Sequence, residues 1–267
     1  MKIWLKKIPR AVQIIRQDGF SGFKQRSVPF FFERLPPRYD QYVKNLSSKF
    51  RYGVPTDPLK TYWISPHAIE HSIQSFDRRI FIGTVKDGNW DRKKIPFSET
   101  SVYRGLRQRF VEGKDWNETC YYQQAKERIE NKGDKWGHQT IDSFEEHRCA
   151  YVDELFERIK TEGYKTQSEI KEKNRDKKRH KNITDRHIKT HEIGCNIGRE
   201  GEFILNTGNH RLAIAKILDI EKIPIKVIVR HEQWQQKRNE IATSSNSTES
   251  ACELCTDPTH PDIQNIN

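Results

Sequence analysis

The chain has 267 residues, of which 34% are hydrophobic and 32% are charged, and it carries a formal net charge of +11. This length allows one large domain or two small ones, and the low hydrophobic fraction predicts that part of the chain lies outside a compact core. The positive balance favours an anionic partner: a nucleotide, a nucleic acid or an acidic membrane surface. No run reaches the roughly 18 apolar residues of a transmembrane helix, so no membrane-spanning segment is predicted.

The cysteines argue against a disulfide framework, because their number is odd and their spacing is irregular. They are Cys120, Cys149, Cys195, Cys252 and Cys255. The N-terminus has no apolar signal-peptide core, so the sequence predicts a cytoplasmic protein. The pair Cys252 and Cys255, with His260 nearby, has metal-like spacing at one end only. A structural zinc ion takes four ligands, and without an obvious fourth no metal site is predicted.

Residues 1–60 are predicted to form a basic arm outside the domain. Over residues 1–19, apolar side chains such as Trp4 and Ile8 recur at helical spacing between lysines and arginines. Such a helix either docks on the protein or lies on an anionic membrane, to which the protein would then be peripheral. Residues 20–60 are rich in Pro, Phe and Arg and predict an irregular segment.

The next elements are a strand and two helices. Residues 61–64, Thr-Tyr-Trp-Ile, favour a strand. Helices are predicted near residues 103–111 and 118–131. Before them, Asp87 and Asp91 flank a glycine. They are either catalytic carboxylates or turn residues whose side chains bond to their own backbone.

The second half of the chain contains two strongly polar segments. A helical pattern at residues 151–162 ends at Gly163, and a basic run follows at residues 171–191. This run is either a solvated loop or a segment that contacts the phosphates of a ligand or a nucleic acid. Residues 239–267 are rich in Ser, Thr and Asn, which predicts a disordered tail.

The most informative pattern lies within residues 203–229. It predicts a strand at 203–205, a helix at 212–218 and an alternating strand at 225–229. Gly208-Asn209-His210-Arg211 lies where the helix begins. A helix N-terminus offers unpaired N–H groups and a partial positive charge, and His and Arg add donors, so this turn is suited to phosphate. Alternatively, Asn209 only caps the helix, and His210 and Arg211 are surface residues.

This turn, the apolar helix after it and the following Ile-Pro-Ile-Lys-Val at residues 223–227 resemble the core of the ParB/sulfiredoxin superfamily. The helix at 151–162 and its glycine turn resemble the elements that precede that core. The resemblance covers residues 151–231 and a first strand near 61–69, which makes residues 83–150 a large helical insertion. It implies an α/β fold, a small mixed sheet with helices, in a domain spanning residues 61–238.

Members of this superfamily bind nucleotide phosphates at the corresponding turn. They include partition proteins that bind CTP, sulfiredoxins that use ATP, and kinases of free serine. Sulfiredoxins have a nucleophilic cysteine where this chain has Asn209, so sulfinic-acid repair is not expected. Partition proteins have a different box and then a helix-turn-helix domain, for which too little chain follows here. The resemblance implies binding of ATP or CTP, with Mg²⁺ on the phosphates, through Gly208, Asn209, His210 and Arg211.

Three function classes remain open. A phosphoryl-transfer enzyme needs a general base, for which Glu202, Asp87 and Asp91 are the candidates. A nucleotide-switched partner protein would bind DNA through its basic surfaces. A membrane-surface accessory protein would use the N-terminal helix and lack catalysis.

Overall fold

A computed structural model describes residues 53–57, 60–74, 82–173, 192–244, 259–264 and 266. The chain divides into two compact units, Met1–Asp57 and Pro58–Asn267, and every element named below belongs to the second. The predicted helix at residues 1–19, the part of the basic run at 174–191, and the pair Cys252 and Cys255 lie outside the described residues.

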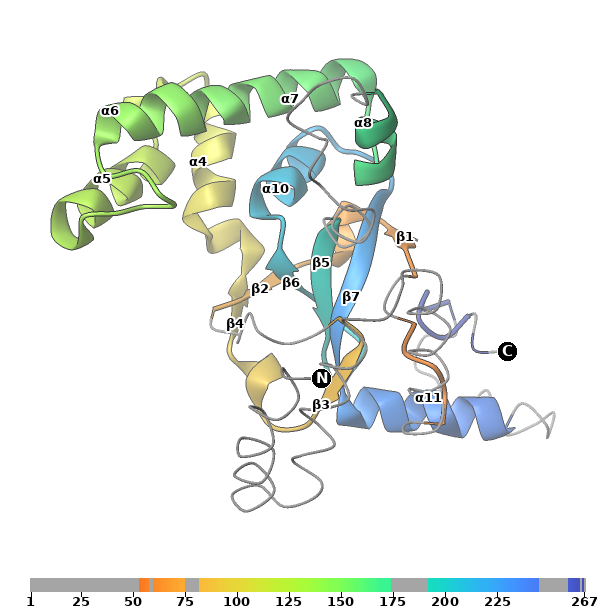
Figure 1. The fold of residues 1–267 in the computed structure, drawn as a ribbon. Helices are drawn as coiled ribbons and strands as arrows, with labels where there is room; N and C mark the ends of the chain where they lie inside the picture. The colour runs from red at the N-terminus through yellow and green to blue at the C-terminus, as the bar shows by residue number, and fades with distance from the viewer. Residues whose placement is uncertain are drawn as a thin grey trace, which may run out of the picture. The chain divides into compact units, whose positions relative to one another are not determined.

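The fold is α/β, as the sequence predicts, and the described residues form a seven-stranded mixed sheet at its centre (Figure 1). The strands are β1 (Tyr62–Ile64), β2 (His71–Ile73), β3 (Thr84–Lys86), β4 (Lys94–Pro96), β5 (Ile193–Ile197), β6 (Phe203–Thr207) and β7 (Ile223–His231). Their order is β1-β7-β5-β6-β2-β4, and β3 pairs with β7. Strands β5 and β7 are parallel, whereas β5 and β6 are antiparallel neighbours joined by a short turn.

Helices cover this sheet and extend beyond it. They are α4 (Ser101–Phe110), α5 (Cys120–Lys132), α6 (Ile141–Ser143), α7 (Ala150–Glu162), α8 (Gln167–Lys173), α10 (Asn209–Ile217) and α11 (Glu232–Ser244). Short 3₁₀ turns are η1 (Pro66–Ala68), η2 (Trp90–Arg92), η3 (Phe97–Glu99) and η4 (Trp116–Glu118), and a π-helical stretch, η5 (Phe144–Cys149), joins α6 to α7. In Figure 1, α4 to α7 lie together at the top, and α10 packs against α4 and α7.

The predicted strand, turn and helix around Gly208 are found as β6 and α10. Gly208 has a φ of 96°, in the left-handed region that favours glycine. A Cβ added there would lie 3.0 Å from Cγ1 of Ile193, the first residue of β5. A glycine is therefore favoured at this position for two reasons: the tight turn needs its left-handed conformation, and the close packing on β5 leaves little room for a Cβ. The helix then buries Leu212, Ala213 and the two residues after them under the inserted helices.

The inserted helices are capped by their own sequence and packed closely together. Thr100 and Thr119 cap α4 and α5 with hydroxyls that accept backbone N–H groups of the first turn. A Cβ on Gly105 of α4 would lie 2.2 Å from Cβ of Tyr121 on α5. Only a glycine therefore permits this approach of the two helices.

One hydrophobic core joins the insertion to the sheet. Leu106 of α4, Val152 of α7 and Ile214 of α10 are fully buried in the same cluster as Ile193 and Leu205 of the sheet. Burial of such side chains is the main favourable contribution to folding. The segment 83–150 is thus part of the same compact unit as the sheet.

The prediction of a disordered tail at residues 239–267 is wrong for 239–244 and 259–264. Helix α11 runs to Ser244. Residues 259–264 fold back so that the carboxylate of Asp262 is fully buried. Asp262 accepts hydrogen bonds from Arg230 of β7, from the indole of Trp234 and from the hydroxyl of Tyr62. Composition could not show this, because the segment is anchored by a few residues: the charged Asp262, together with Ile263, which is buried in the core cluster.

Membrane crossing can be assessed for the part of the chain that the structure describes. None of its helices combines the length and the apolar character that a bilayer-spanning segment requires.

Candidate anion site at the start of helix α10

Helix α10 begins with the predicted tetrapeptide, but its side chains point to different partners. Gly208 is the N-cap and provides no side-chain cap, so the N–H groups of the first turn are not satisfied by it. Asn209 is the first helical residue and not the cap. His210 contacts the insertion, whereas Arg211 contacts Glu192 just before β5. Through His210 and Arg211, the tetrapeptide therefore connects α10 to the insertion and to the segment just before β5.

Both ring nitrogens of His210 are engaged within the protein. Nη2 of Arg148 lies 3.1 Å from Nδ1, and the hydroxyl of Tyr121 lies 2.9 Å from Nε2. A guanidinium can only donate, so Nδ1 is the acceptor and the proton of the neutral ring is on Nε2. Nε2–H then donates to Tyr121 Oη, which also accepts from Nε of Arg148 at 3.4 Å.

The surroundings keep His210 uncharged. Burial, followed by the positive charges of Arg148 and Lys135, lowers the pKa of His210 to about 3. Burial and the nearby Arg128 also lower the pKa of Lys135. Burial is the largest cause of both lowered pKa values, and the neighbouring positive charges add to it. His210 itself is a neutral connector, and the charge of the region comes from its neighbours.

Trp136 holds these cations in place. Nζ of Lys135 lies 4.4 Å from the centre of its ring, and the guanidinium carbon of Arg148 lies 4.9 Å away. Trp136 has a φ of 53° and precedes Gly137 in a two-residue turn closed by backbone hydrogen bonds between Lys135 and His138. A left-handed conformation is strained for a tryptophan, and such strain tends to occur at functional sites. Its indole is 46% exposed, so the cations lie at the protein surface.

The positive charge near His210 is not paired with an acid within the described part of the chain. Among the described residues, no carboxylate forms an ion pair with Arg148 or Lys135. Arg148 instead contacts the rings of Trp136 and Tyr151 and the first turn of α10. We call Lys135, Trp136, Arg148 and the first turn of α10 the anion site.

Arg211 has a structural partner. Its Nη1 lies 3.7 Å from Oε2 of Glu192, and both side chains are largely buried. Burial raises the pKa of Glu192, and the N–H of Gln167 and the charge of Arg211 partly offset that effect. Arg211 therefore compensates a buried acid, whereas no carboxylate that the structure describes pairs with Arg148.

Asp91 is committed to an ion pair. Arg199 donates from Nε to Oδ2 of Asp91 at 2.7 Å and from Nη2 to Oδ1 at 2.8 Å. Burial raises the pKa of Asp91, but the hydrogen bonds from Arg199 outweigh it and bring the pKa to about 2. An ionised carboxylate with both oxygens engaged is a poor proton acceptor, so Asp91 fixes the η2 segment on the turn between β5 and β6.

The other two acid candidates lie near the same turn. Oε1 of Glu202 accepts from Nζ of Lys94 at 2.6 Å. Asp87 is exposed and lies 3.9 Å from the ring of His231. Glu202 precedes β6 and Gly208 follows it, so an extended strand separates them by about 20 Å. Asp87, Asp91 and Glu202 therefore do not share a site with the start of α10.

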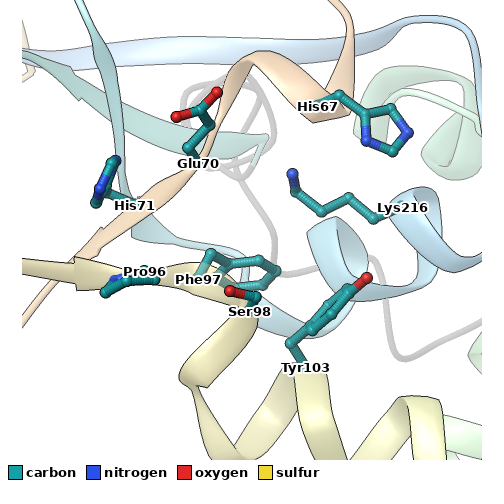
Figure 2. A pocket seen from close by; sticks show the side chains of 8 residues that line it. All are labelled: His67, Glu70, His71, Pro96, Phe97, Ser98, Tyr103 and Lys216. Atoms are coloured by element: carbon teal, nitrogen blue, oxygen red, sulfur yellow. The ribbon is translucent and has the colours of Figure 1, made fainter.

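A separate cleft lies at the other end of α10 and has a volume of about 470 Å³. The described residues that line it are His67, Glu70, His71, Pro96, Phe97, Ser98, Tyr103 and Lys216 (Figure 2). No set of three His, Cys, Asp or Glu side chains in the described part of the chain is arranged to hold a metal ion.

Comparisons with known proteins return no match: no family model, no curated protein and no solved structure matches this chain. The ParB/sulfiredoxin resemblance therefore stays a prediction, and the functional argument rests on the geometry of the sites.

Sequence reasoning missed the residues that give the anion site its charge. Arg148 and Lys135 lie 62 and more residues before His210, within the insertion. One signal was available: Trp136-Gly137 is an aromatic residue directly before a glycine, in a short polar stretch between two helical patterns. Nothing in the spacing shows that this turn meets α10.

Proposed function

We propose that this protein binds the phosphate groups of a nucleoside triphosphate, ATP or CTP, at the anion site. The observation that carries the proposal is the position of Arg148, which touches the first turn of α10 and has no carboxylate partner among the described residues. A guanidinium beside a helix N-terminus offers charge-assisted hydrogen bonds and the helix dipole to the same anion.

The charge balance supports an anion as the ligand. Two cations, Lys135 and Arg148, approach one indole and one neutral imidazole, and no acid among the described residues pairs with either cation. A polyphosphate would compensate these charges, because each nearby negative charge favours the charged form of a base. The ring of Trp136 keeps the two cations fixed, which lowers the entropy lost when an anion binds.

This proposal assigns the residues roles that differ from the simplest use of the motif. Arg148 and Lys135 supply the charge, the backbone of α10 supplies N–H donors, and His210 orients Arg148. Arg211 remains paired with Glu192. Any Mg²⁺ would be held mainly by phosphate oxygens, as is common for this ion, because the described residues provide no ligand cluster of their own.

Phosphoryl transfer is the second part of the proposal and needs an acid or base beside the anion site. Of the three predicted carboxylates, none is at that end of β6. Tyr121 is adjacent, since its hydroxyl touches both His210 and Arg148, but burial raises its pKa above the ordinary value and keeps it protonated. The geometry therefore favours binding of the nucleotide over its turnover.

Calorimetric titration with ATP, CTP and inorganic tripolyphosphate tests the proposal. We expect all three to bind at low salt, and Arg148→Ala to weaken each by about 1.5–3 kcal/mol, the contribution of a charged hydrogen bond. Arg158→Ala on α7 is the matched control, because Arg158 is exposed on the same continuous helical segment. Equal affinity of the Arg148 and Arg158 variants, or no binding by the native chain, would refute the proposal.

A further inference from the structure

The cleft around Lys216 is remote from the anion site. Gly208 and Lys216 stand at opposite ends of α10, about 12 Å apart along the helix axis. The cleft is formed by η1, β2, η3, α4 and the end of α10. Its volume of about 470 Å³ falls within the range of small-molecule sites. Whatever it binds is therefore separate from a phosphate held at the start of the helix.

Lys216 is the side chain that the cleft leaves available. In Figure 2 its amine extends from α10 into the open space toward Glu70 and His67. It forms no ion pair with any described residue. Burial lowers the pKa of Lys216, and the attraction of Glu70 only partly offsets that effect. A partly desolvated amine holds a larger neutral fraction at pH 7 than an exposed lysine does, and the neutral amine is the nucleophile.

Groups that can move protons line the same cleft as this amine. Glu70 lines the cleft, and its carboxylate is not engaged in an ion pair within the described chain. The hydroxyls of Tyr103 and Ser98 lie on the opposite wall (Figure 2). His67 is held at 3.0 Å by Asp219 and borders the cleft near the lysine. An amine nucleophile beside a carboxylate and hydroxyls is the arrangement that carbonyl condensation requires.

We propose that Lys216 is a nucleophilic lysine that forms an imine with a small polar aldehyde or ketone bound in this cleft. The neutral amine attacks the carbonyl carbon, the carbon–oxygen π bond breaks, and Glu70 passes one proton from the nitrogen to the oxygen, which gives a carbinolamine. The nitrogen lone pair then forms the carbon–nitrogen double bond and expels the hydroxyl group, which leaves as water with the second nitrogen proton, again passed on by Glu70. One water is released for each imine, and no oxidant or reductant is consumed.

Reductive trapping tests this assignment. The whole protein is incubated with glycolaldehyde or pyruvate and sodium cyanoborohydride at pH 7, and peptide mass spectrometry measures the rate of labelling at each lysine. We expect Lys216 to react at least tenfold faster than Lys222, an exposed lysine in the turn after α10. A rate at Lys216 no greater than that at Lys222 would overturn the proposal.

Two variants separate chemistry from folding. Lys216→Arg keeps the positive charge and should abolish the fast label while leaving the thermal midpoint near that of the native chain. Glu70→Gln keeps the shape of the side chain and should slow labelling of Lys216, with labelling of Lys222 unchanged as an internal standard. A fast label that persists at another position in Lys216→Arg, or an unchanged rate in Glu70→Gln, would refute the roles given to these residues. Neither variant changes a residue of the anion site, so the proposal of nucleotide binding is tested independently of this one.

Discussion

Nη2 of Arg230 donates a hydrogen bond to Oδ1 of Asp262 over 2.6 Å, although the two residues are 32 positions apart and both side chains are fully buried. Nε of Arg230 reaches the other carboxylate oxygen at 2.8 Å, which completes a bidentate pair. A buried pair of this kind is costly to break, because the remaining charge is left without a partner in a medium of low polarity.

Asp262→Ala should therefore destabilise the protein strongly. It leaves Arg230 buried and uncompensated, and we expect the free energy of unfolding to fall by about 3–5 kcal/mol. Urea unfolding followed by tryptophan fluorescence measures the change. Gln264→Ala is the control, since that side chain is exposed in the same segment. Similar midpoints for both variants would show that the C-terminal segment does not stabilise the sheet.

His210 should make the stability of the protein depend on pH. Its pKa is about 3 in the folded chain, against an ordinary value of 6.5. Between these values the unfolded chain carries a proton that the folded chain lacks, so stability falls as the pH falls. We expect about 1.4 kcal/mol for each pH unit below 6.5. His210→Gln should remove this slope between pH 6.5 and pH 5 in urea titrations.

Asp91 and Glu192 also make stability depend on pH, but their effects differ from that of His210 in pH range or in sign. The lowered pKa of Asp91, about 2, costs stability only when the pH falls below its unfolded value near 3.8. The raised pKa of Glu192 acts in the opposite sense, because its acid form is favoured by folding. A slope that is identical in the native chain and in His210→Gln would contradict the neutral, buried state of the ring.

Gly105→Ala should separate the inserted helices. The new methyl group would lie 2.2 Å from Cβ of Tyr121, so α4 and α5 must move apart. Overpacking of this kind costs about 1–3 kcal/mol, more than the gain in helix propensity. Thermal unfolding measures the change, with Arg104→Ala, exposed on the same helix, as the control. A midpoint equal to or above that of the control would contradict the close approach.

Arg211→Ala should affect stability through Glu192. Loss of the guanidinium leaves a buried carboxylate without its nearest positive charge, and we expect a loss of about 1–3 kcal/mol. Glu192→Gln removes that charge, so the double variant should recover much of the loss. Additive effects in the double-mutant cycle would show that the pair does not interact.

The sequence predicts the segments whose structure is decided locally. The β6–α10–β7 unit follows from alternation, a left-handed glycine and helical spacing, all within 30 residues. The short strands β2 and β4 carry no such pattern, because three residues cannot show a period, and they pair over long range, β2 with β6 and β4 with β2. Strand β5 was also missed, since Ile193–Ile197 includes a glycine and an asparagine that disfavour strands.

The candidate site likewise has a part that can be predicted from local sequence and a part that depends on long-range packing. The start of α10 is predictable because a helix N-terminus and its donors are neighbours in sequence. Arg148 and Tyr121 are not, because they meet His210 only through the packing of the insertion on α10. The predicted carboxylates cannot act at the start of α10, because they lie near the opposite end of β6 and an extended strand holds its two ends far apart. The order of residues in the sequence does not reveal this distance.

The π-helical stretch η5 fixes the angular phase of α7. Phe144 and Cys149 are five residues apart and both are buried. In an α-helix, five steps of about 100° would turn them some 140° away from each other, whereas the wider π-turn brings them onto one side. Deletion of the exposed Glu146 would leave Phe144 and Cys149 four residues apart, and four steps of about 100° again place both on one side of a regular helix. The segment should thus accept replacement or deletion of that residue without a change in the buried face of α7.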